Sequence, residues 1–183
     1  MQQDIMAALL AARGVSIKHP HAGLVAYGSK RAEIRDYDTK HRGLSLIHAS
    51  QEPDATWRNV IPGVHHNGVE LMMFQSDLAY GAVLALAVLR DTVPLRYPDP
   101  RVDPISFVRP HIGRKAWLFA PKVVRLPEPI PWPGALAPWP VANELAQRIA
   151  SQMEEYGLCL PSDTRAERSA TSSTSSRSEE SHS

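Results

Sequence analysis

The sequence predicts an α+β domain: a small mixed β-barrel with helices on its outside, followed by a disordered C-terminal tail. Several short apolar or alternating runs are joined by proline-rich connections, which favours a closed or half-closed barrel over a doubly wound sheet. Helix signals occur near both ends of the domain and once near residue 21. After residue 160 the chain becomes serine-rich and almost free of apolar residues.

Three segments carry the helix signals. Residues 2–12 place apolar side chains on one side, and Gly14 is expected to end this helix. Residues 21–28 fit a short helix closed by Gly28. Residues 141–156 repeat apolar residues at a spacing of four, which predicts a helix that packs on the domain.

The predicted strands are short runs that alternate in polarity or are continuously apolar. They comprise residues 15–19, 32–37, 44–50, 81–93 and 115–126, the last bent at Pro121, with an edge strand within 135–141. The run 81–93 is nearly continuously apolar, as in a strand that is buried on both faces. Residues 51–80 are mixed in composition, and a helix and loops are expected there.

The length of 183 residues predicts one domain with appendages. We assign an N-terminal helix to residues 1–14, the folded domain to 15–160 and a disordered serine-rich tail to 161–183. The tail cannot bury enough apolar surface to offset the entropy that ordering would cost.

Composition excludes several classes of protein. The net charge of +1 provides no overall basic field, so contact with nucleic acid requires a local patch. The single Cys159 excludes an intramolecular disulfide framework and favours a reducing compartment. No apolar run approaches the roughly 20 residues that cross a bilayer, and the N-terminus is a poor signal peptide. We expect a cytoplasmic protein that needs no membrane, metal or cofactor.

The segment Gly28–Gly43 concentrates charge directly before a predicted core strand. Its charged residues are Lys30, Arg31, Glu33, Arg35, Asp36, Asp38, Lys40 and Arg42. If residues 32–37 are extended, Glu33 and Arg35 point to the same side, close to Lys30. Such a cluster can line a polar cleft, because burying unpaired charges is costly. It can equally form a solvated hairpin with weak surface ion pairs, and both interpretations stay open here.

The cleft interpretation gives each of these side chains a chemical role. Glu33 can accept hydrogen bonds from an exocyclic amine or act as a general base, and Lys30 can hold a phosphate or polarise a carbonyl group. Lys30 and Arg35 are expected to lower the pKa of Glu33. His48, at the end of a strand, is either a satisfied core histidine or a catalytic base. Tyr37 and Trp117 are either packing residues or platforms on which bases stack.

Two motifs resemble the activating signal cointegrator homology (ASCH) family. Gly28, Lys30, Glu33 and Arg35 match the family pattern Gly-x-Lys-x-x-Glu-x-Arg. The following residues Arg42–Ala49 are similar to the family segment Arg-Gly-x-hydrophobic-x-Ile-His-Ala. The likeness extends over roughly residues 15–142.

The resemblance implies a β-barrel like that of pseudouridine synthase and archaeosine transglycosylase (PUA) domains, with a cleft between barrel and helix that takes RNA or a modified base. Some small relatives look like hydrolases of acylated cytidine nucleosides, whose motif has threonine where this chain has Glu33. The chain also departs from the family at His21 and His41, where aromatic residues are usual.

The leading hypothesis is therefore an ASCH-like module that binds RNA or a modified nucleotide. The residues expected to bind the ligand are Lys18, Lys30, Glu33, Arg35, Tyr37, Arg42 and Trp117. The alternative is an enzyme, either a nucleoside amidohydrolase or a ribonuclease, with Lys30 and Glu33 as its acid/base pair. A protein-interaction adaptor is a third possibility.

Overall fold

The structure is a computed structural model that describes residues 2–54, 64–66, 69–71, 78–96, 99–102 and 114–162. Apart from its first two residues, the segment 161–183 lies outside the described residues. The elements in chain order are α1 (Gln2–Ala11), β1 (Arg13–Ile17), α2 (His21–Ala26), β2 (Ala32–Arg35), β3 (Gly43–Ala49), β4 (Val64–His66), β5 (Val69–Leu71), β6 (Ala82–Pro94), β7 (Lys115–Phe119), β8 (Val124–Pro131), β9 (Trp139–Pro140) and α3 (Asn143–Glu155).

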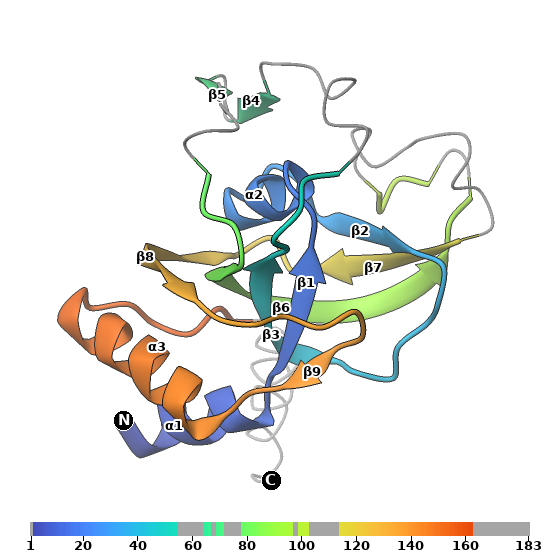
Figure 1. The fold of residues 1–183 in the computed structure, drawn as a ribbon. Coiled ribbons are helices and arrows are strands. Elements are labelled where there is room, and N and C mark those ends of the chain that lie inside the picture. Colours follow the sequence, from blue (N-terminus) through green and yellow to red (C-terminus); the bar gives the residue numbers. More distant parts are fainter. Residues whose placement is uncertain are drawn as a thin grey trace, which may run out of the picture.

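A mixed sheet of seven strands forms the centre of the molecule (Figure 1). Its order is β2-β7-β6-β3-β1-β9, with β8 paired to β6, while β4 and β5 form a separate two-stranded sheet. β1 runs parallel to β3, and the other ladders are antiparallel. The α+β class is thus confirmed. Among the described strands no ladder joins β2 to β9, so the sheet is open rather than closed into a barrel by strand pairing.

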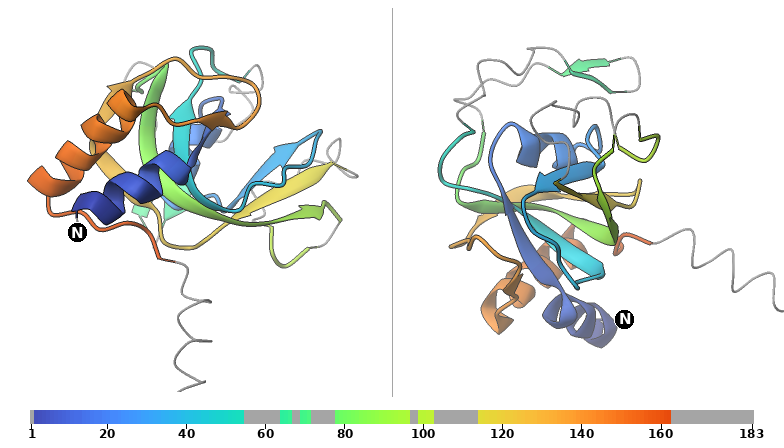
Figure 2. Two further views of the ribbon diagram at one scale, coloured as in Figure 1. Left: turned by 90° about the horizontal axis from the view of Figure 1, so that it is seen from below. Right: turned by 90° about the vertical axis from the view of Figure 1, so that its right-hand side faces the viewer.

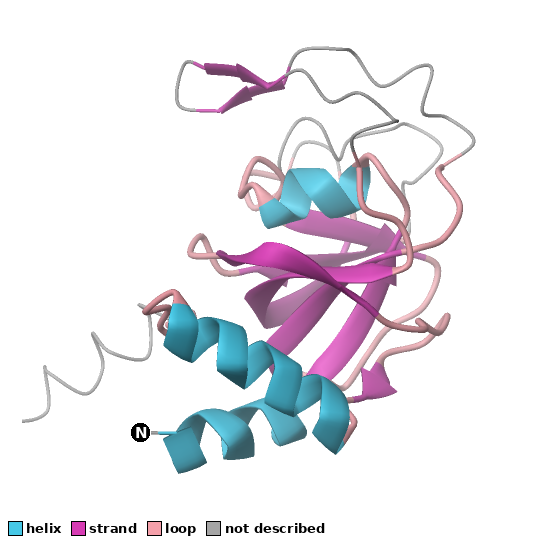
Figure 3. Cartoon of the chain, turned by 60° about the vertical axis from the view of Figure 1, so that its left-hand side comes forward, coloured by secondary structure: helices cyan, strands magenta, loops and turns pink. Residues whose placement is uncertain are grey.

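The two central strands β3 and β6 are buried on both faces because helices cover each side of the sheet. Leu46 of β3 packs in the cluster that contains α1 and α3, whereas its neighbour Ile47 packs in the cluster that contains α2. Leu86 and Ala85 of β6 alternate in the same way. Figure 3 shows α1 and α3 side by side on one side of the sheet and α2 on the other. This arrangement confirms the prediction of burial on both faces for residues 82–89 of the run 81–93, whereas Asp91 further along the strand is exposed.

The helices agree with the sequence except at the end of α1. α3 buries Leu145, Ile149 and Met153, the three residues whose spacing predicted it, and Gly28 follows α2 with a φ of 74°. Gly14 was expected to terminate α1, but it lies inside β1 and the helix ends at Ala11. The reason for a glycine at this position is steric, as shown by the strand that packs on it.

The Trp139 indole ring of β9 covers Gly14 and takes the space that a side chain would need. A Cβ on residue 14 would lie 2.1 Å from ring atoms of Trp139. β9 pairs with β1 at this position, which confirms the predicted edge strand. Figure 2 shows β9 beside β1 and close to the start of α3.

One further expectation differs from the structure, and another falls mostly outside the described residues. The predicted strand 115–126 is two strands, β7 and β8, separated at Ala120–Val123 and paired with different parts of β6. A helix was expected within residues 51–80, and most of that range lies outside the described residues. The described residues of the range include β4 and β5, which pair with each other. Among the described helices, none is long and apolar enough to span a bilayer.

Candidate functional site

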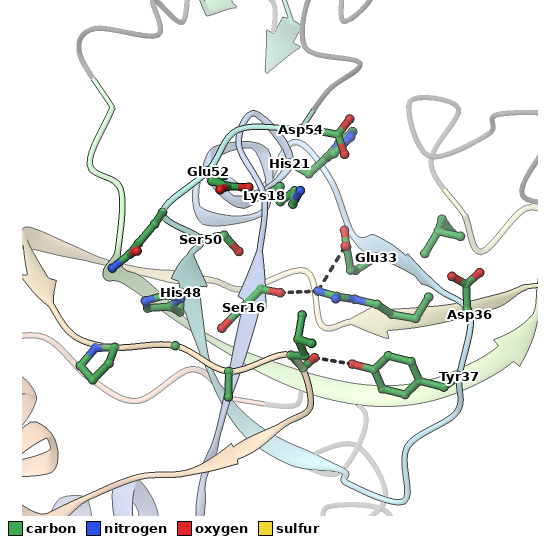
Figure 4. Close-up of a pocket in the computed structure, with 17 residues that line it drawn as sticks. Ser16, Lys18, His21, Glu33, Asp36, Tyr37, His48, Ser50, Glu52 and Asp54 are labelled. Atoms are coloured by element: carbon green, nitrogen blue, oxygen red, sulfur yellow. Dashed lines mark hydrogen bonds and ion pairs between the residues drawn. The ribbon is translucent and has the colours of Figure 1, made fainter.

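A cavity of about 600 Å³ opens where β1, β2 and β3 approach the β8–β9 connection (Figure 4). Such a volume lies within the range of about 300–1,000 Å³ that is usual for small-ligand sites. The cavity is lined by Ser16, Lys18, His21, Glu33, Ile34, Arg35, Asp36, Tyr37, His48, Ser50, Gln51, Glu52, Asp54, Pro133, Gly134, Ala135 and Leu136.

Three strands supply the cavity with polar side chains at alternate positions. β1 and its end supply Ser16 and Lys18, and β3 and its end supply His48 and Ser50. β2 supplies Glu33 and Arg35. Residues two apart in a strand share a face, so each strand presents a polar pair while the residue between them faces the core or the rim. The parallel register places Ser16 directly opposite His48.

Glu33 forms the buried centre of a three-residue charge cluster. Lys30 Nζ lies 2.6 Å from Glu33 Oε2, and Arg35 Nη2 lies 3.4 Å from Oε1. Lys30 is 3% exposed and Glu33 is 8% exposed. The cluster is therefore not part of a solvated hairpin, and two of its three side chains, Glu33 and Arg35, line the cavity.

The charge state of Glu33 follows from its neighbours. Burial raises the pKa of its carboxyl group, but the charges of Lys30, Arg35 and His21 and the Lys30 hydrogen bond together outweigh burial, so that the pKa lies below its usual value. Glu33 is consequently an anion at neutral pH. It is a good acceptor for ligand N–H groups and a weak general base, because a depressed pKa means low proton affinity.

Arg35 links two strands that do not pair with each other. Its Nη2, on β2, donates a hydrogen bond to the Ser16 carbonyl of β1. The guanidinium also lies over the Trp117 ring, 5.7 Å from its centroid. The Arg35 Nε is buried and has no hydrogen-bond partner in the part of the chain that the structure describes.

Trp117 packs behind the residues that line the cavity, and Tyr37 lies at its edge. Trp117 is fully buried on β7, opposite Glu33 in register, and its Nε1 donates to the Tyr37 carbonyl at 3.2 Å. The two rings meet edge to face, 5.5 Å apart. The Tyr37 hydroxyl donates to the Leu136 carbonyl at 2.7 Å, which ties the β2–β3 connection to the β8–β9 connection.

The structure brings together four of the seven residues that were predicted to bind ligand. Lys18, Glu33, Arg35 and Tyr37 line the cavity. Lys30 and Trp117 lie one layer behind it, where they contact Glu33, Arg35 and Tyr37 rather than the cavity. Trp117 is therefore a packing and positioning residue in this structure, not an exposed stacking platform.

Arg42, the seventh predicted residue, lies outside the cavity. It donates to the Thr92 hydroxyl at 2.8 Å and pairs with Asp91 at 3.3 Å, both on β6. Asp38 is also exposed and pairs with Lys115 at 3.3 Å. The second half of the charged segment 28–43 is thus the solvated surface that the alternative interpretation described, while Lys30 and Glu33 in its first half are buried.

Several lining residues were not predicted from the sequence. Ser16 and His21 flank the cavity, and Gly134 sits against its inner wall. In the sequence His21 was noted only as a departure from the ASCH pattern. A sequence signal did exist: the alternating triplets Ser16–Lys18 and His48–Ser50 repeat the polar-apolar-polar pattern of Glu33–Arg35. In the described part of the chain no group of three His, Cys, Asp or Glu side chains is arranged to hold a metal ion.

Comparison with protein-family models and with curated proteins finds no match for this chain.

Proposed function

We propose that this protein is a binding module of the ASCH type, with a PUA-like barrel, that accepts a nucleoside or a single nucleotide of RNA in the cavity beside Glu33. The observation that carries the proposal is the buried anion Glu33, which lines the cavity next to the Arg35 guanidinium. An acceptor and a donor 3.4 Å apart match the edge of a nucleobase, which presents amine and carbonyl groups side by side.

The charges around the cavity favour a base over a run of phosphates. Lys18 and Arg35 are the two Lys or Arg side chains of the lining, and carboxylates from Glu33, Asp36, Glu52 and Asp54 surround them. Binding that relies on about two phosphate contacts predicts a slope of roughly −1.4 for log K against log salt with single-stranded RNA. A long electrostatic track would give a much steeper dependence on salt.

The placement of Lys30 gives no support to the hydrolase and ribonuclease alternatives. That lysine is covered and directed at Glu33, so it does not reach a bound substrate directly. Glu33 itself is a weak base, as argued above from its lowered pKa. We therefore favour binding over catalysis. Incubation with acylated cytidine and with RNA, followed by chromatography, tests the alternative through the appearance of products that are lost in Glu33→Gln.

Fluorescence anisotropy with labelled, mixed-sequence, single-stranded RNA at low salt tests the proposal, together with calorimetric titration of the four ribonucleosides. Arg35→Met is the test variant, and Arg42→Met is its matched control because Arg42 is a surface arginine of the same segment outside the cavity. We expect Arg35→Met and Glu33→Gln to weaken binding at least tenfold, and Arg42→Met to change it little. Equal loss in the two arginine variants, or no binding by the natural chain, contradicts the proposal.

A further inference from the structure

His48 occupies the inner wall of the cavity with one ring nitrogen committed and the other unused. The side chain is 2% exposed, and its Nε2 lies 2.8 Å from the Trp132 carbonyl oxygen. A carbonyl oxygen only accepts hydrogen bonds, so Nε2 carries the proton and Nδ1 holds a lone pair. Burial lowers the pKa of His48 and outweighs the opposing effect of the Trp132 carbonyl, which keeps the ring neutral.

The lone pair on Nδ1 is a buried acceptor without a donor. The atom has no hydrogen-bond partner among the described residues and almost no contact with solvent. A buried polar atom of this kind destabilises a fold, so its presence calls for a physical reason. The adjacent Ser16 hydroxyl does not satisfy it and instead accepts a hydrogen bond from Trp139 Nε1 at 3.2 Å.

Gly134 of the β8–β9 connection covers this nitrogen. A Cβ on residue 134 would lie 2.6 Å from His48 Nδ1 and 2.5 Å from Ser16 Oγ. Both polar atoms therefore lie against the same side of Gly134, where no side chain has room. Any side chain at this position would have to lift the connection or displace the His48 ring.

The connection that covers His48 is held lightly. Residues 133–137 are exposed, and the Leu136 side chain is 92% exposed. Among the described residues, one hydrogen bond holds the segment between Trp132 and Trp139, the one from the Tyr37 hydroxyl to the Leu136 carbonyl. Tyr37 is itself 39% exposed, so water competes for this bond.

We propose that Pro133–Leu136 covers a second compartment of the cavity, in which His48 Nδ1 and Ser16 Oγ accept a neutral N–H or O–H donor of the ligand once the segment lifts. A neutral imidazole acceptor selects a group that carries a proton, such as a ribose hydroxyl or a base amine, and gains nothing from an ionised phosphate oxygen. That the donor belongs to a nucleotide rests on the function proposed above, whereas the compartment itself does not.

Chemical modification tests the compartment without any ligand. Diethyl pyrocarbonate acylates a neutral imidazole nitrogen that it can reach, and His48 is the single histidine of residues 43–58, the tryptic peptide between Arg42 and the cleavage site after Arg58. Loss of the Tyr37 hydroxyl in Tyr37→Phe should raise the modification rate of His48 roughly fivefold, the effect of one exposed hydrogen bond.

Two further variants complete this test. Gly134→Ala, which forces the segment away from His48, should raise the rate as well, and Tyr156→Phe on the distant end of α3 should leave it unchanged. If His48 is modified equally slowly in the natural chain, in Tyr37→Phe and in Gly134→Ala, the segment does not lift and the compartment does not exist. Tyr37→Phe removes a single exposed hydroxyl, so the test survives even if Gly134→Ala fails to fold.

Nitrogen-15 NMR of the His48 ring tests the ligand part, with each of the four ribonucleosides as probe. The free protein should show the tautomer with a proton on Nε2, and a nucleoside that binds should shift the Nδ1 signal toward that of a hydrogen-bonded nitrogen. His48→Phe should weaken this nucleoside about tenfold, and His48→Asn, whose Oδ1 replaces the acceptor, should recover most of the loss.

The outcomes separate this inference from the proposed function. Binding that depends on Glu33 but is indifferent to His48→Phe refutes the role of the compartment and leaves the proposed function intact. Failure of all four nucleosides and of RNA to bind refutes the proposed function and with it the nucleotide donor, while the modification rates still decide whether the compartment opens.

Discussion

Replacing Lys30 with methionine is expected to destabilise the fold strongly, because it leaves the Glu33 carboxylate buried beside only one cation. Lys30 Nζ lies 2.6 Å from Glu33 Oε2, and both side chains are buried. Removal of one partner from a buried ion pair costs about 3–5 kcal/mol. Since Arg35 still lies 3.4 Å from Oε1, we expect the lower end of this range, a loss of about 3 kcal/mol in the free energy of unfolding.

Urea denaturation followed by tryptophan fluorescence measures this loss. For a domain of this size, about 3 kcal/mol corresponds to a fall in Tm of about 6–12 °C. Lys115→Met is the matched control: it removes the same side chain from an exposed pair with Asp38, and little change is expected.

The dependence on pH separates loss of charge pairing from loss of packing. Glu33 has a lowered pKa in the folded state, so its ionised form stabilises the protein above about pH 4.3, its value in the unfolded chain, and this contribution disappears as pH falls through the lower folded pKa. In Lys30→Met the folded pKa of Glu33 rises. The deficit of the variant should therefore shrink below about pH 4. A deficit of the same size at acid and neutral pH would refute the reasoning, as would a loss no larger than that of Lys115→Met.

Three other expectations follow from contacts in and around the cavity. Gly14→Ala should cost about 1–3 kcal/mol in chemical denaturation, because a Cβ there meets the Trp139 ring at 2.1 Å; a neutral effect would speak against this packing. Trp117→Phe removes the donor to the Tyr37 carbonyl, so it should weaken RNA binding severalfold with a small loss of secondary structure. Unchanged affinity would show that Trp117 does not position Tyr37. His48 should titrate below its usual pH of about 6.5 in NMR, and stability should fall as the pH is lowered through that region; an ordinary pKa would contradict its burial.

The sequence predicted most of the strands and helices because burial on both faces leaves a clear pattern. Alternation placed Glu33 and Arg35 on one face of β2, and the nearly continuous apolar run 81–93 identified the central strand β6. The position of Gly14 inside β1 was not predictable, since the ring that requires it, Trp139, lies far along the chain and packs there only in the folded state.

The composition of the cavity could be predicted only in part, for a similar reason. The spacing of Lys30, Glu33 and Arg35 indicated that they meet, but it did not show that Lys30 lies behind the other two. Arg42 was wrongly predicted to bind ligand, because the chain leaves the cavity after Tyr37. On the surface its guanidinium pairs with Asp91 and donates to the Thr92 hydroxyl, both on β6. Long-range pairing between strands decides such placements, and a local pattern carries no information about it.

Backbone amide NMR of the full chain, with ribonucleosides and a short single-stranded RNA as probes, tests most directly whether a nucleotide binds in the cavity beside Glu33. We expect the ligand-induced changes to concentrate on residues 16–18, 33–37, 48–50 and 133–136, and Glu33→Gln to remove them. Changes centred on the α1–α3 side of the sheet, or a pattern that Glu33→Gln leaves intact, would contradict it.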